Sequence, residues 1–506
     1  MDPDRMPVIL SVGQVTYKGE DLKAAQELLT EAAQIVVDEA NSKHSGMQVQ
    51  NFIDKVVVVN ILGKKEEAPA GLLAQSLKIE DAKCYYTTVG GNTPQYLVNK
   101  YSKEISEGKT TAVLISGAEA MASSKKYKQQ KTEGVLSNLD KVDKEYKVQS
   151  DILLGEDRVG LSEQEIEAGL ISPAHVYPMF EAVIAKNEGR SILQQREYIS
   201  ELFAHFTEVA AKNEFAWFKT PLGPKELAEA SKDNRPIADP YLKLHCAFLG
   251  SDQGAAYILT SWAVAKSLKM QDEVIFVHSG ADAADIWNFS ARPEYDISEG
   301  INLAATSCLE VAGITIDDIN FIDFYSCFPS PVQLAIKALG LSDKDSRGFT
   351  ITGGLPYFGG PGNNYVSHSI AKMTETLREN DGFGLVSGLG WYVTKHSYGI
   401  YSNKPPMSGF KMADTQHGQG QIDSKEITVQ KNGELTPQSA KIVTASPAYG
   451  PMGDVFMVPA ILELRDGSRA VLPCGERDLN EFKEVELVDK TVEIRGEQPR
   501  WYLGQN

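Results

Sequence analysis

The chain has 506 residues, 42% of them hydrophobic and 23% charged, with a formal net charge of −18. This length exceeds one ordinary hydrophobic core and predicts two to four domains. A pI near 5.0 argues against general nucleic-acid binding. We expect no membrane span, because no apolar run reaches about 18 residues. The five cysteines lack paired spacing, which predicts a cytoplasmic protein without a disulfide or metal framework.

The first half of the chain alternates strand and helix patterns. A strand is predicted over residues 8–15 and a helix over 21–40, and the β-branched run at 56–59 predicts a second strand. Continuous apolar character is typical of a strand buried on both faces of a parallel sheet. A glycine-containing loop at 89–95 then precedes a predicted helix over 96–107 and a strand over 111–117.

The second half repeats this order. The tetrapeptide Asn-Phe-Ile-Asp occurs at 51–54 and again at 320–323, each time after a helix. The second copy leads to a glycine-rich loop at 353–365, a helix over 365–378 and a strand over 384–388. The repetition predicts an internal duplication of a βα unit. The long glycine loop is either a tight surface turn or a cradle whose N–H groups receive an anion or a polarised carbonyl.

Residues 123–239 are more polar and predominantly helical, with a lysine cluster around Lys125 and Lys126. The cluster is either a solvated face or a site for a phosphate-bearing ligand. Beyond residue 402 the pattern changes to short alternating segments at 426–429, 440–444, 455–464 and 469–472, and Asp466-Gly467 predicts a hairpin. We therefore expect a small OB-like β-barrel that serves packing or a partner protein.

Four motifs in order resemble those of the thiolase superfamily over residues 1–402: the segment 107–121, the Asp-Gln-Gly-Ala-Ala at 252–256, the Asp-Phe-Tyr-Ser-Cys-Phe at 323–328, and the long glycine loop. The resemblance implies a duplicated, five-layered αβαβα fold, with an N-terminal half at 1–265, a C-terminal half at 266–402 and an additional β domain at 403–506. The tail is similar to that of type 1 thiolase-like proteins related to sterol-carrier-protein thiolases. Proteins of this kind are usually named acetyl-CoA acetyltransferase.

The resemblance also shows that the family's catalytic residues are replaced. Its nucleophilic cysteine corresponds to Gly91, and the histidine of its Gly-His-Pro motif corresponds to Gly360. Its second cysteine corresponds to Ser387 or Gly388. Thiolysis needs a thiolate, an imidazole and a second thiol, none of which glycine supplies. We therefore expect chemistry other than that of a classical thiolase.

The remaining polar groups suggest an altered site. Tyr325 matches a tyrosine of thiolase-like aldolases, and a phenol whose pKa is lowered by nearby donors can move a proton. His396 is expected in the loop after the last strand, with a catalytic or a structural role; Cys327 is a core thiol or a nucleophile. The predicted catalytic residues are Tyr325, His396, Cys327 and Asn364. The predicted ligand-binding residues are Gly91, Asn92, Thr93, Gly359, Gly360, Gly362, Asn363, Lys125 and Lys126.

Three functions follow from this pattern. The first is an acyltransferase-like enzyme of lipid metabolism that makes or breaks a C–C bond in an acyl-CoA thioester, through an oxyanion hole and Tyr325 or His396. The second is a non-catalytic acyl-CoA or lipid-binding protein, and the third is a scaffold that holds a partner through the C-terminal domain. The resemblance implies coenzyme A thioester as substrate or ligand, no tightly bound cofactor, and a homodimer.

Overall fold

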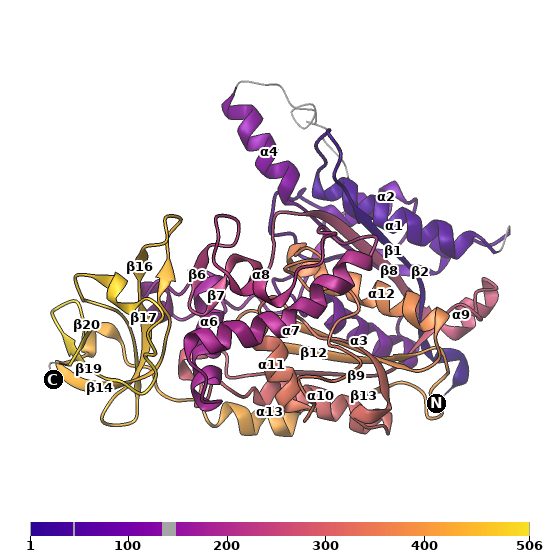
Figure 1. Cartoon of the computed structure of the whole chain (residues 1–506). Coiled ribbons are helices and arrows are strands. Elements are labelled where there is room, and N and C mark those ends of the chain that lie inside the picture. Colours follow the sequence, from indigo (N-terminus) through magenta and orange to yellow (C-terminus); the bar gives the residue numbers. More distant parts are fainter. Residues whose placement is uncertain (1, 44–45, 134–147, 505–506) are drawn as a thin grey trace.

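The computed structural model describes residues 2–43, 46–133 and 148–504 (Figure 1). In these residues one large mixed sheet holds 11 strands. Its first-half strands are β1 (Pro7–Thr16), β2 (Ile53–Val58), β3 (Lys83–Thr87), β4 (Ala112–Ala120), β5 (Ile152–Leu154) and β8 (Asp252–Ser261). Its second-half strands are β9 (Ile275–Ala284), β10 (Ile319–Asp323), β11 (Phe383–Gly390), β12 (Lys395–Ser402) and β13 (Lys411–Met412).

The strand order repeats outward from the centre of the sheet. One side runs β1-β8-β4-β2 and the other runs β9-β12-β11-β10. The two sides join where Val8 and Ile9 pair antiparallel with Phe276 and Ile275. In both halves the strand that starts with the repeated tetrapeptide runs parallel to its neighbour, β2 beside β4 and β10 beside β11. The predicted parallel strands are confirmed. The repeated strand order agrees with the predicted duplication, which remains a prediction together with the five-layered arrangement.

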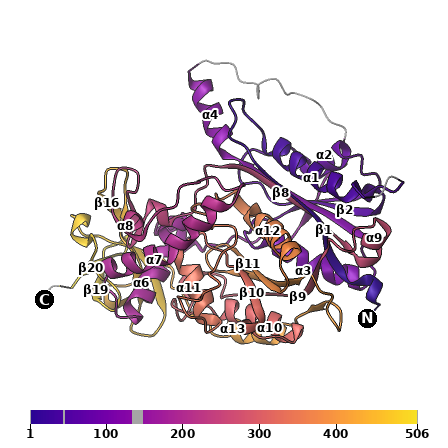
Figure 2. The same ribbon diagram turned by 45° about the vertical axis from the view of Figure 1, so that its right-hand side comes forward.

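Helices cover and separate the two halves (Figures 1 and 2). Helices α3 (Thr93–Ser106) and α12 (Tyr365–Glu379) contact each other and strands of both halves, so they form the central layer. Helices α1 (Ala25–Asn41) and α2 (Pro69–Ser76) pack on the outer face of the first half, and α10 (Glu299–Ala312) packs on β9 and β12 of the second half. α11 (Pro329–Ala338) lies beside α10.

The insertion between β4 and β8 is mainly helical, as predicted. It contains α4 (Met121–Thr132), α5 (Glu163–Glu167), α6 (Pro173–Asn187), α7 (Ile192–Lys212) and α8 (Pro224–Ala228). Helix α4 extends away from the body in both ribbon views. After α8, the short strands β6 (Pro236–Ala238) and β7 (Tyr241–Leu242) lead back to β8, which is followed by α9 (Trp262–Ser267).

The C-terminal residues form antiparallel sheets. β14 (Gln438–Ala445), β17 (Pro459–Glu463), β18 (Arg469–Pro473), β19 (Thr491–Arg495) and β20 (Arg500–Leu503) pair in the order β18-β17-β14-β19-β20. The hairpin predicted at Asp466-Gly467 joins β17 and β18. A single bridge between Cys474 and Trp501 brings the two edges of this sheet together around the buried indole. An OB-like topology remains a prediction.

Two expectations for the tail were wrong in detail. The predicted strand at 426–429 is reduced to one bridge between Val429 and Arg469. The apolar run at 455–464 splits into β16 (Val455–Met457) and β17, and β16 joins a second sheet with β15 (Ala448–Tyr449), β6 and β7. Helix α13 (Gln416–Asp423) packs on α10. The chain therefore passes from the second half to the tail without a clear break, and the domain boundaries remain predictions.

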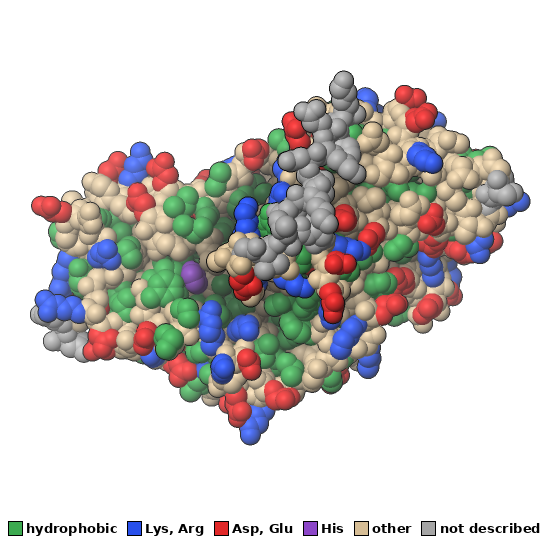
Figure 3. All heavy atoms as spheres, turned by 90° about the horizontal axis from the view of Figure 1, so that it is seen from above, with side chains coloured by type: hydrophobic (Ala, Val, Ile, Leu, Met, Phe, Trp, Pro, Cys, Tyr) green, Lys and Arg blue, Asp and Glu red, His purple; other side chains and the backbone are tan. Residues whose placement is uncertain are grey.

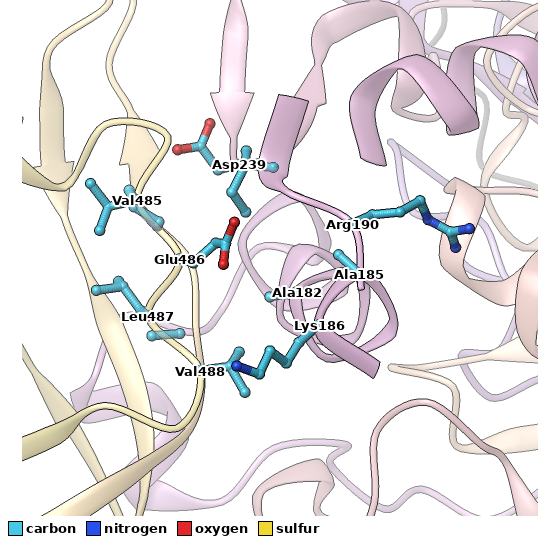
Figure 4. Close-up of a pocket in the computed structure, with 12 residues that line it drawn as sticks. Ala182, Ala185, Lys186, Arg190, Asp239, Val485, Glu486, Leu487 and Val488 are labelled. Atoms are coloured by element: carbon cyan, nitrogen blue, oxygen red, sulfur yellow. The ribbon is translucent and has the colours of Figure 1, made fainter. Parts of the chain in front are cut away.

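Buried charges fasten the tail to the insertion. Arg196 of α7 contacts Asp239 at 3.3 Å and Glu484 at 2.7 Å, and the Tyr449 hydroxyl donates to Asp239. Beside this network, Ala182, Ala185 and Lys186 of α6 face residues 485–488 of the tail across a small pocket (Figure 4). Among the described residues, no helix is both long and apolar enough to cross a bilayer.

Candidate functional site

The two glycine loops meet and are tied by side-chain amides. The backbone N–H of Gly90, in the loop between β3 and α3, donates to Asn363 Oδ1 at 3.0 Å. The Asn363 amide nitrogen in turn donates to the carbonyl and side-chain oxygens of Asn60, at 3.1 and 3.0 Å. Asn363 therefore holds the long loop against both the first loop and the end of β2.

Tyr325 fills the space beside Gly91. A β-carbon built on Gly91 would overlap the Tyr325 hydroxyl oxygen and lie 2.5 Å from the Leu389 carbonyl oxygen. Any larger residue would therefore need a rearrangement. The backbone N–H of Tyr325 donates to Ser387 Oγ at 2.9 Å, and its ring packs edge-on against Tyr365. These contacts fix the phenol beside Gly91.

The phenol is a proton donor rather than a base. Burial, reinforced by the charge of the Cys327 thiolate form, raises the pKa of Tyr325 well above its ordinary value. The expectation of a lowered pKa was wrong, because among the described residues no cation or donor offsets the loss of solvent around the ring. A neutral hydroxyl is suited to donating a hydrogen bond to a carbonyl oxygen or an oxyanion.

The glycines of the long loop are required by their surroundings. Gly359 has φ +110°, and a β-carbon there would overlap the side-chain oxygen of Gln253. Gly362 has φ +54°, and its β-carbon would lie 2.5 Å from Glu119 Oε1. Gly360 donates its N–H to the Phe248 carbonyl at 2.8 Å. The loop is thus packed against β8 and the end of β4 and is not a free surface turn.

Glu119 supports this loop from the end of β4. It is buried, and its two carboxylate oxygens accept the N–H groups of Leu62 and Gly63 at 2.5 and 3.1 Å. Burial raises the pKa of the Glu119 carboxyl to about 7, although both hydrogen bonds act in the opposite direction. Its protonation therefore changes near neutral pH, next to Gly362.

Lys395 is a site residue that the sequence did not reveal. Its Nζ donates to the Val89 carbonyl at 2.7 Å, and a β-carbon on Gly90 would lie 2.6 Å from Nζ. Burial lowers the pKa of this amine to about 8, while the charge of Glu156 acts weakly in the opposite direction. The side chain is half-buried, so it reaches both the loop and the solvent.

Asn92 and Thr93, predicted in the first glycine loop, lie instead at the start of α3, which begins earlier than expected, and both are buried. The amide nitrogen of Asn92 donates to Ser397 Oγ at 3.1 Å, whereas its Oδ1 has no hydrogen-bond partner in the described part of the chain. A β-carbon on Gly90 would lie 2.7 Å from this oxygen. Asn92 thus presents an unused acceptor beside Lys395.

His396 lies elsewhere than expected. It is the second residue of β12 rather than part of a loop, and successive side chains of a strand point to opposite faces. Because Lys395 points to the glycine loops, His396 points to α10, where its Nε2 lies 2.8 Å from Asp285 Oδ2. Asp285 also accepts the N–H of Gly300 at 3.2 Å. The pair joins β9, β12 and α10.

The two other predicted catalytic residues have structural surroundings, as does His368 of α12. Cys327 is buried, and burial raises the pKa of its thiol to about 12. The Asn364 amide nitrogen donates to the Gly117 carbonyl at 2.6 Å, and its Oδ1 accepts from Ser367, so it joins α12 to β4. His368 is also buried, and its Nδ1 contacts Gln14 Oε1 at 2.9 Å.

Lys125 and Lys126 belong to α4, which begins directly after β4. Both are on the exposed part of the helix, and Lys126 Nζ donates to the Glu20 carbonyl at 2.6 Å. Residues 134–147, which follow this helix, lie outside the described residues. The two lysines therefore lie beyond the end of β4, the strand that contains Glu119.

Comparison with solved structures identifies the fold. A monomeric SCP2-thiolase-like protein type 1 from Mycobacterium smegmatis superposes with a TM-score of 0.81 at 28% identity, over 100% of both chains. The chain is a thiolase-superfamily protein. The Acat5 thiolase from Ascaris suum in complex with coenzyme A matches with a TM-score of 0.54 at 15% identity, over 78% of this chain and 99% of that one. The Ltp2-ChsH2(DUF35) aldolase matches with a TM-score of 0.59 at 17% identity, over 79% of this chain and 99% of that one.

Sequence comparison gives a more limited result. An acetyl-CoA acetyltransferase from Methanothermobacter thermautotrophicus is 26% identical over 194 residues, which are 38% of this chain and 48% of that protein. The match therefore spans about half the length of this relative. No protein-family model matches the chain. The superfamily assignment consequently rests on the fold together with this partial match.

Proposed function

We propose that this thiolase-superfamily protein binds an acyl-CoA thioester between its two glycine loops and acts on a carbonyl of the acyl group without a cysteine nucleophile. The supporting observation is the Tyr325 hydroxyl, which fills the space beside Gly91 where the family's nucleophile would lie. The amide of Asn363 ties the two loops on either side. Coenzyme A thioester is the expected ligand, as the names of the similar proteins suggest.

The chemistry we propose is electrostatic. Negative charge develops on a carbonyl oxygen when a C–C or C–S bond next to it forms or breaks, and a pre-positioned hydrogen-bond donor stabilises it. Tyr325 would supply that donor, because its phenol stays protonated at neutral pH. The buried loops exclude water from one side of such a carbonyl, which strengthens the hydrogen bond. Cys327, Asn364 and His396 would act as structural supports.

Turnover of acyl-CoA thioesters by Tyr325→Phe tests this function. Removing one oxyanion donor typically lowers kcat by about 100-fold to 1,000-fold. Tyr198→Phe is the matched control, because Tyr198 lies on α7 and stacks with Arg190, away from the glycine loops. The proposal fails if Tyr325→Phe leaves turnover of every thioester unchanged while the unmodified protein is active.

A second candidate is binding without catalysis. The position of the Tyr325 hydroxyl favours it, since the hydroxyl fills the space beside Gly91 where a covalent intermediate would form. Saturable binding of acetyl-CoA together with no thiolysis, condensation or C–C cleavage would support this function. Detectable turnover in the purified protein would exclude it.

Partners form a separate part of the proposal. Hydrophobic side chains gather on the C-terminal lobe in Figure 3, and Met452 and Phe456 near β16 are 89% and 53% exposed. We infer that this surface receives a partner protein.

A homodimer through β3 would have to accommodate β5, which pairs with β3 and exposes Ile152 and Leu153 at the edge. Light scattering of the purified chain decides between monomer and dimer. The five free cysteines fit a reducing compartment.

A further inference from the structure

Lys395 lies in space that glycines leave open. Its Nζ is 2.6 Å from the point that a β-carbon on Gly90 would occupy, and its Cε is 2.9 Å from the corresponding point on Gly390. The next glycine, Gly91, faces the Tyr325 hydroxyl. An amine and a phenol therefore lie against consecutive residues of one loop.

Unused hydrogen-bonding capacity lies next to the amine. Asn92 Oδ1 is buried, accepts no hydrogen bond in the described residues, and lies 2.7 Å from the same β-carbon point on Gly90. A buried acceptor without a donor is costly unless a ligand or water supplies one. The nitrogen or hydroxyl of a bound intermediate could supply it, since Nζ lies 2.6 Å from that same point.

The amine is also available in its neutral form. With a pKa of about 8, about half of the Lys395 side chains are neutral at pH 8. An ordinary lysine is neutral in roughly one molecule in 250 at that pH. Glu156 is the carboxylate whose charge acts on the amine, and its effect is smaller than that of burial. Neutral amines in partly desolvated sites are nucleophiles toward carbonyl carbons.

We propose that Lys395 forms a reversible imine with an aldehyde or ketone carbonyl held between the first glycine loop and Tyr325. The Nζ lone pair adds to the carbonyl carbon, and the C=O π electrons move to oxygen. The nitrogen loses a proton and the oxygen gains one, giving a carbinolamine. A second proton transfer releases the oxygen as water while the C=N bond forms. Water adds back to reverse the reaction, so no oxidant or reductant is consumed.

Tyr325 is placed to assist this step as a neutral donor to the carbonyl oxygen. The inference requires a ketone or aldehyde but no coenzyme A, so it extends beyond thioester binding. A 3-oxoacyl chain is the substrate class that would satisfy both the imine and the proposed thioester binding, because it carries a ketone one carbon away from the thioester carbonyl. Once protonated, the imine would withdraw electrons from the bond between the neighbouring carbon and the thioester carbon, and an enamine would form.

Borohydride trapping tests the inference. The full chain is incubated with acetoacetyl-CoA or with the acetoacetyl thioester of N-acetylcysteamine, reduced with sodium borohydride, and mapped by peptide mass spectrometry. We expect a borohydride-dependent secondary amine at Lys395 whose yield rises with a midpoint near pH 8. Lys225, whose side chain is 85% exposed, is the internal comparison and should be trapped at least tenfold less at that pH. Lys395→Arg keeps the charge and should abolish the adduct.

Two results would overturn the inference. One is no enrichment at Lys395 over Lys225, and the other is an adduct at Lys395 that forms without borohydride, which would be an amide from attack on the thioester. Mapping the unmodified chain decides the matter even if Lys395→Arg folds poorly. Trapping of the N-acetylcysteamine thioester in a chain that fails to bind acetyl-CoA would uphold the imine and refute the proposed function. Binding of acetyl-CoA without trapping at Lys395 would uphold the proposed function and refute the imine.

Discussion

The hydroxyl of Tyr325 occupies the space that a side chain on Gly91 would need. The two residues are 234 positions apart in the sequence. Gly91 lies between β3 and α3, and Tyr325 follows β10. The space beside Gly91 is therefore not empty, because the phenol of Tyr325 fills it. We expect this pairing to limit the chemistry that the proposed site can perform.

Gly91→Ala should destabilise the protein by about 1–3 kcal/mol, since overpacking a filled site forces its neighbours to move. Tyr325 and the Leu389 carbonyl are the groups that must shift. Urea denaturation measures the cost. Gly433→Ala is the matched control, because nothing lies within 4 Å of its β-carbon position, and it should be nearly neutral. Equal effects of the two substitutions would show that the space beside Gly91 is open.

Most of the large elements could be predicted from the sequence, because apolar periodicity and the repeated tetrapeptide reflect burial directly. Which side of β12 faces the site could not be predicted from the sequence. Lys395 and His396 are adjacent, and a histidine is the more familiar catalytic residue. Only the register of β12 against β9 and β11 shows that the lysine faces the loops. Glu119 was within a recognised motif, but its raised pKa depends on burial that the motif does not encode.

Glu119 should make stability depend on pH. Its pKa rises from 4.5 in the unfolded chain to about 7 in the folded one. The folded state then binds more protons between these values, so its contribution is full below pH 4.5 and is lost as the pH rises through about 7. Glu119→Gln should flatten this part of the profile of unfolding free energy against pH. Glu201→Gln, at an exposed position, is the control. An unchanged slope in Glu119→Gln would contradict the burial argument.

Lys125 and Lys126 provide a test of ligand charge. If they contact the phosphates of coenzyme A, Lys125→Gln with Lys126→Gln should weaken acetoacetyl-CoA binding by about tenfold, or about 1.4 kcal/mol. Binding of the uncharged N-acetylcysteamine thioester should not change. Lys128→Gln with Lys131→Gln on the same helix is the control for general charge. Calorimetry that shows equal losses for both double variants would assign the cluster to a solvated face.

Arg196 should hold the C-terminal sheet in place. Arg196→Met leaves Asp239 buried without its cation, and breaking such a pair typically costs about 3–5 kcal/mol. Hydrogen exchange over residues 438–503 should increase more than exchange in β1 or β8. Lys225→Met breaks the exposed ion pair with Glu229 and should cost less than about 1 kcal/mol. Unchanged exchange in the tail would mean that its apolar contacts suffice.

The most direct test of the central claim is a crystal structure of the protein soaked with acetoacetyl-CoA. We predict the acyl group between Gly90–Asn92 and the long glycine loop, with a carbonyl oxygen within hydrogen-bond distance of the Tyr325 hydroxyl. A fully occupied ligand bound elsewhere, for example between α6 and the tail (Figure 4), would contradict the proposal. So would glycine loops that hold no ligand and do not change when acetoacetyl-CoA is present at saturating concentration.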